Sequence, residues 1–226
     1  MRVWLVAAFA GLCAASTAGD VSSKPVKARF AVDGQNYAAT LPDGFCLPDE
    51  VTRGQAETLA AVDPWSLTDL VFFSCAETAA TGDPVHYGMI KTPKRSLGRK
   101  VSPRAELLAE LKSEIRDGSL AEDFRRLDLT GDADKAIKDQ IGVELKLSGQ
   151  PQFVAVDDKA GYLLDVAGAE VGGKRARMTF VAAITVVRGR ILTWGEYAPY
   201  TSNADLAALL RRVKVEIAKF IADNGG

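Results

Sequence analysis

Alternating apolar and polar positions dominate the second half of the chain. This two-residue period, interrupted by Gly, Pro and Asp, predicts strands at 143–147, 152–156, 161–167, 175–187 and 190–198. Arg188 and Gly189 supply a tight hairpin turn between the last two strands. We therefore expect an antiparallel sheet to occupy most of this half.

Both faces of these strands carry large apolar side chains. One face holds Tyr162, Leu164, Val166, Val181, Leu192 and Trp194. The other face holds Leu163, Phe180, Ile184, Val186 and Ile191. Because a sheet that is apolar on both sides must be covered on both sides, we expect helices against each face. The predicted fold class is α+β, with an antiparallel sheet in an α/β/α sandwich.

The last segment of the chain predicts one covering helix. Ser202 is its N-cap, Asp205 follows three residues later, and Asn224 and Gly225 end it. Its apolar residues follow helical spacing at Leu206, Leu209, Leu210, Val213, Ile217 and Phe220. This apolar stripe is expected to pack on the sheet.

An earlier segment predicts a second helix. Ser102 is the expected N-cap, Pro103 the first helical residue, and Gly118 lies just past the end. Acidic residues repeat every four positions on this helix, at Glu106, Glu110 and Glu114. A rail of carboxylates can bind a metal, but a solvated helix face explains this stripe better.

The remaining elements are shorter. A hairpin turns at Asp33-Gly34, residues 41–50 are expected to form turns, and residues 51–62 a short helix. Two neighbouring strands are predicted at 68–74 and 87–90, and one or two short helices within 119–141.

The first residues have the pattern of a signal peptide. Met1-Arg2 precedes an apolar run from Val3 to Cys13, and Ser16-Thr17-Ala18 offers a cleavage site before Gly19. The apolar run of about 11 residues is shorter than the roughly 20 that a membrane-spanning helix needs. Leu12 stands where lipoprotein processing needs a small residue. We therefore expect a periplasmic or secreted protein that is neither membrane-spanning nor lipid-anchored.

Composition narrows the possible functions without choosing one. The chain is 47% apolar and 25% charged, with a formal net charge of −1. These values exclude a collagenous repeat, a disordered acidic tail and a polytopic membrane protein, and they argue against nucleic acid as a partner. No repeat or linker divides residues 19–226, which are expected to form a single domain.

Two cysteines remain after the predicted signal peptide. In an oxidising compartment, Cys46 and Cys75 are expected to form a disulfide. The alternative is a free nucleophilic thiol, which would need a nearby base. His86 is the only histidine in the chain, so a cysteine or histidine hydrolase would depend on it.

Two motif-like segments do not carry their usual chemistry. Residues 168–174 approach a phosphate-binding P-loop, but Arg175 replaces the magnesium-binding Ser or Thr and the segment joins two strands. Residues 128–139 resemble a calcium loop, but Ala133 replaces the required Gly and Asp139 the closing Glu. We expect a hairpin turn and a helix cap at these places, and no cofactor or metal.

Two carboxylates interrupt apolar strands. Asp165 follows Leu164, and Glu196 lies between Gly195 and Tyr197. Burial could raise the pKa of each carboxyl into a range useful for catalysis. The pair is therefore a candidate active site for a small envelope hydrolase or transferase. The simpler alternative is that strand ends and edges place both carboxylates in water.

A basic segment is the most distinctive local feature. Six cations and no acid occur between residues 91 and 104, at Lys91, Lys94, Arg95, Arg99, Lys100 and Arg104. Pro93 and Gly98 favour an exposed loop. The segment is either a solvated loop or a docking surface for an anionic lipid, glycan or acidic protein of the envelope. It lacks the interleaved aromatic residues of a single-strand nucleic-acid site.

The chain also resembles the PsbP-like family over about residues 36–223. The similar residues are Tyr37 through Phe45, Ala160-Gly161-Tyr162, the strand and turn at 186–191, and the end of the last helix through Phe220. The resemblance implies an α/β/α sandwich around an antiparallel sheet and a non-catalytic accessory role. The Cys46 and Cys75 pair lies outside that family's pattern.

Two hypotheses follow from the sequence. The first is an exported, non-catalytic binding or assembly-accessory protein of the cell envelope. The second is a small envelope enzyme that uses Asp165, Glu196 or an unbridged cysteine. The sequence contains no recognisable catalytic constellation, which favours the first hypothesis.

Overall fold

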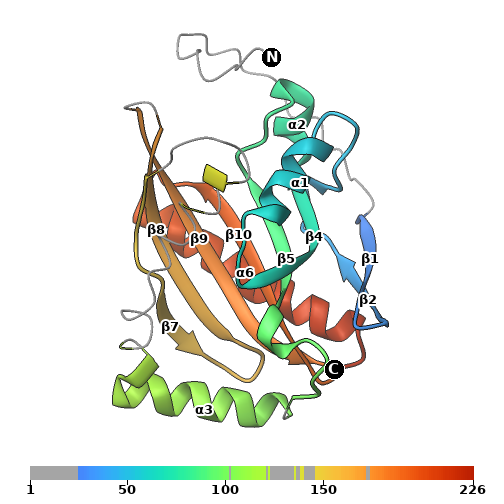
Figure 1. Ribbon diagram of the computed structural model, residues 1–226, viewed down its shortest axis with the longest axis vertical. Coiled ribbons are helices and arrows are strands. Elements are labelled where there is room, and N and C mark those ends of the chain that lie inside the picture. The colour runs from blue at the N-terminus through green and yellow to red at the C-terminus, as the bar shows by residue number, and fades with distance from the viewer. Residues whose placement is uncertain are drawn as a thin grey trace.

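The computed structural model describes residues 25–101, 103–120, 122, 135, 138–139, 146–171 and 174–226. The predicted signal peptide, most of the helices expected within 119–141, and most of the calcium-like segment lie outside these residues. Within them, eight strands form one antiparallel sheet in the order β3-β4-β5-β10-β9-β8-β6, and β7 also pairs with β8 (Figure 1). The strands are β3 (Phe45–Cys46), β4 (Ser66–Ser74), β5 (Tyr87–Pro93), β6 (Lys146–Ser148), β7 (Gln152–Val156), β8 (Gly161–Val171), β9 (Lys174–Val187) and β10 (Arg190–Pro199).

One face of this sheet is covered by α6 (Asn203–Asp223) and by a separate hairpin of β1 (Lys27–Val32) and β2 (Gln35–Thr40). Ser202 caps α6 by accepting a hydrogen bond from the Asp205 amide, as predicted. The main core lies beneath α6 and includes the buried residues Tyr162, Val181, Leu192, Trp194, Val213, Ile217 and Phe220. None of the described helices has the length and apolar character needed to cross a membrane.

The opposite face is covered in two places. α1 (Arg53–Ala61) packs over Val71, Phe73 and Met89 at one end. α3 (Arg104–Asp117) lies over β7 and β9 at the other end (Figure 1). The α+β fold class, with helices on both faces of an antiparallel sheet, is confirmed.

Side chains from the end of α6 hold the β1–β2 hairpin in place. Asn224, which is 2% exposed, accepts a hydrogen bond from the Ala38 amide at 3.0 Å and donates to the Ala38 carbonyl at 2.8 Å. Asp223 accepts from the Thr40 amide at 2.9 Å. These bonds satisfy backbone groups on the outer edge of β2, which would otherwise remain unpaired.

Most predicted elements are present, with shifted ends. α3 begins at Arg104 rather than Pro103, because Pro103 has an extended ψ of 150° and is itself the N-cap; Ser102 lies outside the described residues. The P-loop-like segment is a hairpin, since Val171 pairs with Lys174. The prediction of turns alone at 41–50 is wrong at β3, which pairs with the end of β4.

One short helix was not expected from the sequence. α2 (Cys75–Thr81) has no apolar periodicity that would reveal it. It begins at the Ser74 cap, which accepts a hydrogen bond from the Glu77 amide, and ends at left-handed Gly82. Capping and tertiary contacts, rather than an apolar stripe, therefore define this helix.

Candidate anion-binding surface

The prediction that residues 91–104 form one exposed loop is wrong. The segment contains the end of β5, the short 3-10 helix η1 (Lys94–Ser96), a loop and the start of α3. β5 continues to Pro93 because its backbone pairs with β4 on one side and β10 on the other. The six cations therefore have different surroundings, and only some of them can meet a ligand.

Lys91 does not belong to an anion-binding surface. Its ammonium lies 2.9 Å from Asp63 Oδ2, and both side chains are only 16% exposed. Burial lowers the pKa of Lys91, but the Tyr197 hydroxyl and the Asp63 carboxylate beside it outweigh burial and raise the pKa above its ordinary value. Lys91 is thus a charged group neutralised inside the fold.

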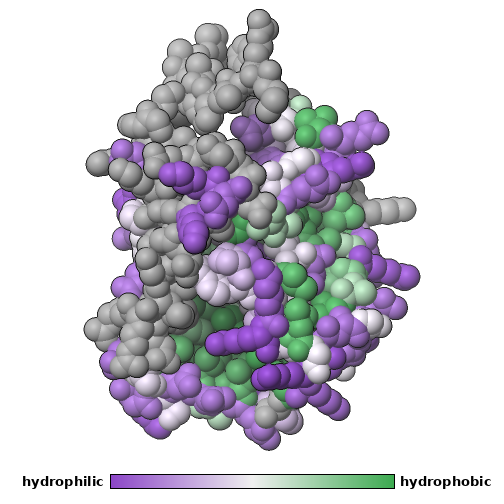
Figure 2. Space-filling view, in the orientation of Figure 1, coloured by the Kyte–Doolittle hydropathy of each residue, from purple (hydrophilic) through white to green (hydrophobic). Residues whose placement is uncertain are grey.

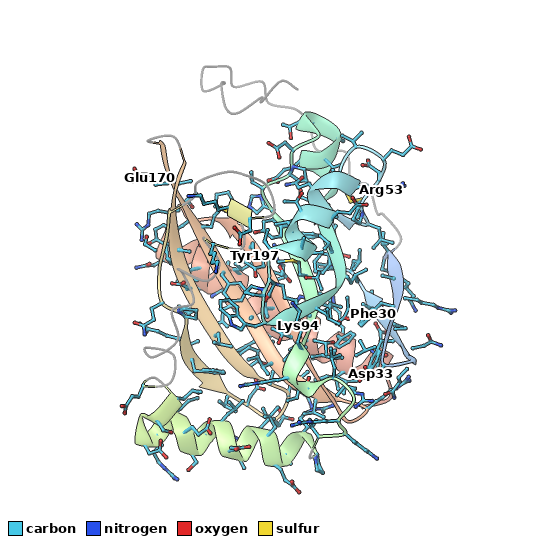
Figure 3. The ribbon with its side chains drawn as sticks, viewed as in Figure 1. Phe30, Asp33, Arg53, Lys94, Glu170 and Tyr197 are labelled. Carbon is cyan, nitrogen blue, oxygen red and sulfur yellow. A yellow bond between two sulfur atoms is a disulfide. The ribbon has the colours of Figure 1, made fainter. Side chains whose placement is uncertain are left out.

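The other five cations lie at one end of the molecule together with Arg188, and we call these six residues the basic end. Lys94, Arg95, Arg99, Lys100 and Arg188 are exposed, and Arg104 is half-buried. Figure 3 shows Lys94 in the lower half of the view, where Asp33 also lies. Arg188 joins the group because the β9–β10 turn, where Arg188 and Gly189 have φ values of 50° and 75°, lies beside the basic segment.

Several cations of the basic end bind neutral carbonyl groups. Lys94 Nζ donates to the carbonyls of Asp63 and Pro64 at 3.1 and 3.0 Å. Arg104 Nε donates to the Val186 carbonyl at 3.1 Å, and Arg188 donates to the Asn36 and Asn224 carbonyls at 2.9 and 2.8 Å. A carbonyl positions a cation without cancelling its charge, so these residues remain net positive.

Backbone contacts hold the loop of the basic end against two turns. Asp33 Oδ2 accepts from the Gly98 amide at 2.8 Å and lies 3.3 Å from Arg190 Nη2. The Val101 amide donates to the Gly189 carbonyl at 3.1 Å. The side chain of Lys100 packs on Gly189, where an added Cβ would come within 3.1 Å of Lys100 Cγ. The cations are therefore presented from a fixed loop.

No cation of the basic end forms an ion pair with a described acid, and three of them also have no side-chain hydrogen bond among the described residues. They are Arg95, Arg99 and Lys100. Asp33 is used by Gly98 and Arg190, and the Asp158 carboxylate, which lies near Arg104, pairs with Lys159 at 2.9 Å. Unpaired, fixed cations at one end of a molecule attract anions and direct their approach.

Arg188 is a part of this surface that sequence reasoning assigned only to a turn. The hydrogen bond between Val101 and Gly189 brings two segments together that are distant in the chain. No local sequence signal reports such a contact. The Arg-Gly pair predicted the hairpin turn, but not that the basic segment lies beside it.

The two candidate catalytic carboxylates lie on opposite faces of the sheet. Asp165 pairs with Phe180, which pairs with Tyr197. Glu196 is the neighbour of Tyr197 along β10, so its side chain points to the α6 face. The structure therefore separates Asp165 from Glu196, and they do not form a joint active site.

Glu196 is enclosed within the α6 face. It is fully buried, accepts a hydrogen bond from Trp194 Nε1 at 3.1 Å, and pairs with Arg212 Nε at 2.5 Å. Burial raises the pKa of Glu196, Glu216 adds to the rise, and Arg212 and Trp194 reduce it. Burial also raises the pKa of Asp165, which is half-buried and accepts from the Gln150 amide at 3.2 Å.

The disulfide between Cys46 and Cys75 is confirmed, with a Cα–Cα distance of 5.2 Å. It joins β3 to the first residue of α2. A free-thiol enzyme would need one of these two sulfurs, so the disulfide removes the nucleophile of that alternative. Among the described residues, no three His, Cys, Asp or Glu side chains are grouped to hold a metal ion.

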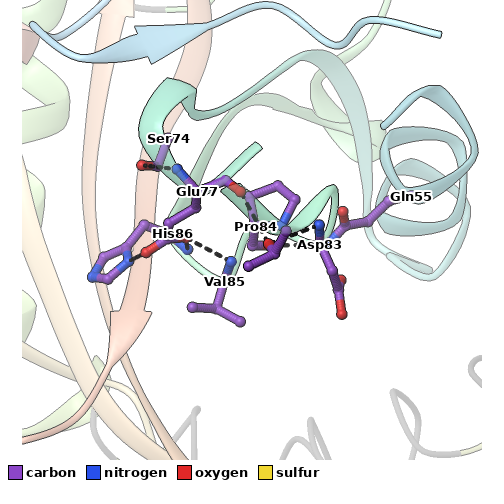
Figure 4. A network of polar contacts seen from close by, with 8 residues as sticks. Gln55, Ser74, Glu77, Asp83, Pro84, Val85 and His86 are labelled. Carbon is purple, nitrogen blue, oxygen red and sulfur yellow. Dashed lines mark hydrogen bonds and ion pairs between the residues drawn. The ribbon is translucent and has the colours of Figure 1, made fainter. Parts of the chain in front are cut away.

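His86 belongs to a local network at the start of α2 (Figure 4). Its Nδ1 contacts Glu77 Oε1, while Glu77 Oε2 accepts from the Val85 and His86 amides at 2.8 Å each. Ser74 Oγ is used in capping the Glu77 amide at 3.4 Å. The network fastens the turn before β5 to α2, and Ser74 is engaged with the helix start rather than with the imidazole.

No family model and no curated protein sequence matches the chain. Among solved structures, the solution structure of cyanobacterial PsbP (CyanoP) from Synechocystis sp. PCC 6803 is similar to it, with 14% sequence identity and a TM-score of 0.37. The match covers 89% of this chain and 96% of that chain. This neighbour is a member of the family that the sequence resembles.

Proposed function

We propose that the protein is an exported, non-catalytic binding or assembly-accessory protein of the cell envelope, and that its basic end attaches it to an anionic envelope component. The observation that carries this proposal is the set of three unpaired cations, Arg95, Arg99 and Lys100, held on η1 and the fixed loop after it. A protein seldom keeps such a group for stability, because like charges held close together repel.

The expected binding strength follows from the number of cations. Each Lys or Arg near an anionic surface contributes about 1 kcal/mol. Removing three of them should therefore weaken attachment by about 100-fold. Because the interaction is between exposed charges, it should also weaken steadily as the salt concentration rises.

The test is cosedimentation with vesicles of phosphatidylglycerol and phosphatidylcholine over a series of salt concentrations. The variant Arg95→Ala, Arg99→Ala, Lys100→Ala is compared with Lys27→Ala, Arg53→Ala, Arg211→Ala, which removes the same charge from exposed positions outside the basic end. The first variant should lose binding and the second should keep it. Equal binding by both variants, or binding that salt does not weaken, would refute the proposal. A parallel arm with lipopolysaccharide distinguishes a lipid surface from an anionic glycan.

Export is the second part of the proposal. It is supported by the sequence pattern of residues 1–18 and by the disulfide, since disulfides persist mainly in oxidising compartments. The expected product begins near Gly19, and the intact mass of the protein recovered from the periplasm or medium tests this. Recovery of the full-length chain from the membrane fraction would contradict it.

A further inference from the structure

An apolar hollow adjoins the basic end. It has a volume of about 350 Å³ and lies between α3 and the sheet, lined by Leu107 and Leu111 of α3, Phe153 of β7, Ile184 of β9 and Ile191 of β10. Figure 2 shows hydrophobic atoms recessed above α3 on this face of the molecule. Its volume is within the range of small-molecule sites, about 300–1,000 Å³.

The hollow exists because the two helices on this face cover different ends of the sheet. α1 packs over β4 and β5, whereas α3 packs over β7 and β9. Leu111 and Phe153 press on Gly161, where an added Cβ would come within 2.8 Å of Leu111 Cδ1 and 3.1 Å of Phe153 Cε1. Close packing at Gly161 closes one side of the hollow, and the neighbouring space beside Ile184 and Ile191 stays open.

Arg95 also lines the hollow, and it is the residue that links the hollow to the basic end. It is exposed and has no acidic partner among the described residues. Two acids of α3 share the lining, Glu110 and Glu114, and Glu114 is already engaged in another interaction. Lys94 precedes Arg95 in η1, and Arg99 and Lys100 follow in the loop after it.

We propose that the hollow binds one anionic amphiphile, with its single apolar chain against the five apolar residues and its carboxylate head on the Arg95 guanidinium. This inference rests on the proposed function, because it names the chemical class of the anionic component that the basic end meets. An apolar lining favours the hydrocarbon chain of the amphiphile, and a guanidinium forms two parallel hydrogen bonds with a carboxylate.

The probe is dodecanoate, used below the concentration at which it forms micelles and followed by titration calorimetry. One dodecanoate should bind per chain. Each methylene moved from water into an apolar site strengthens binding by about fourfold, so dodecanoate should bind at least tenfold more tightly than octanoate. A dodecyl chain with a trimethylammonium head should bind more weakly than dodecanoate, because Arg95 would repel it.

Two kinds of variant locate the site. Arg95→Ala should weaken dodecanoate binding about tenfold or more, whereas Arg53→Ala, at the opposite end, should leave it unchanged. Thr193→Phe, or Leu107→Trp where the first does not fold, fills the hollow and should abolish binding while circular dichroism and the unfolding temperature show an intact fold. Equal binding by Arg95→Ala and wild type, or tighter binding of the cationic amphiphile, would overturn the inference.

Vesicle cosedimentation separates the failure of this inference from that of the proposed function. If vesicles bind the protein in the expected salt-dependent manner but dodecanoate does not, the amphiphile site is refuted and the proposed function stands. If neither the vesicles nor dodecanoate bind, both are refuted.

Discussion

On each face of the large sheet, one charged strand residue pairs with the element that covers that face, and the two pairs have opposite polarity. On the α6 face, the sheet provides the carboxylate of Glu196 and the helix provides Arg212, at 2.5 Å. On the opposite face, the sheet provides the ammonium of Lys91 and the segment after α1 provides Asp63, at 2.9 Å. Each of these two charges is thus matched by the element that covers it.

The basic end differs from both faces in this respect. Arg95, Arg99 and Lys100 lie outside the strands, and none of them forms an ion pair with a described acid. A charge that the fold neutralises contributes to structure, whereas one that the fold leaves in water is available to a partner. Glu196 and Lys91 were candidate site residues by sequence. Both are neutralised within the fold, so we assign them a structural role.

Breaking the pair on the α6 face should have the largest effect. Arg212→Met leaves the fully buried Glu196 without its cation, and we expect the free energy of unfolding to fall by about 3 kcal/mol. Urea denaturation measures this change. The double variant Glu196→Leu, Arg212→Met should recover most of the loss, because it leaves no buried charge unpaired. An Arg212→Met variant as stable as wild type would show that the pair does not neutralise Glu196.

The pH dependence of the same variant sharpens this test. The pKa of Glu196 is raised in the fold, so the native state binds its proton more tightly than the unfolded state does. The contribution of this group to stability is therefore complete below its ordinary pKa of 4.5 and is lost as pH rises through the raised value. Without Arg212 the pKa rises further, so in Arg212→Met the loss should continue to higher pH than in wild type.

Breaking the pair on the opposite face should have a smaller effect, because both side chains are partly exposed. Asp63→Asn should lower the free energy of unfolding by about 2 kcal/mol. Burial raises the pKa of Asp63, but Lys91 and the Trp65 and Ser66 amides outweigh burial and lower it. In wild type the stabilisation is therefore present above pH 3.8, the ordinary pKa, and is lost as pH falls below it.

The matched control for Asp63 is Asp158→Asn. Asp158 pairs with Lys159 at the same distance of 2.9 Å, but its side chain is 80% exposed. We expect no measurable change in the urea midpoint, because exposed pairs are screened by solvent. A larger loss in Asp158→Asn than in Asp63→Asn would contradict the distinction between buried and exposed pairs.

Apart from the Asp158→Asn control, the smallest effect is expected at the surface network of α2. Glu77→Gln should lower the free energy of unfolding by about 1 kcal/mol, because a neutral amide is a weaker acceptor for the Val85 and His86 amides. The loss is small because solvent screens this site. Burial opposes the shift, but bonds from His86 and Val85 lower the pKa of Glu77. The wild-type urea midpoint should therefore fall as pH drops below 4.5, and the midpoint of Glu77→Gln should fall less.

The sequence predicted those parts of the fold that depend on periodic patterns. The strands of β7, β9 and β10 and the stripe of α6 have repeats of two and of about 3.6 residues, and these repeats determine which side is buried. The pairing of Lys91 with Asp63 could not be predicted, because it depends on how the segment after α1 packs on β5. A run of Lys and Arg residues shows that a segment is positively charged. It does not show which group each cation contacts, because tertiary contacts decide that.

The most direct test of whether the basic end binds an anionic surface is to locate binding on the protein by nuclear magnetic resonance. Isotope-labelled protein is titrated with bicelles containing phosphatidylglycerol, and backbone amide shifts are compared with those in neutral bicelles. We expect the largest changes at residues 94–101 and 188–190, and we expect added salt to reverse them. Largest changes around residues 47–51 and 83–86, at the end that holds α1 and α2, or the same changes with neutral bicelles, would contradict it.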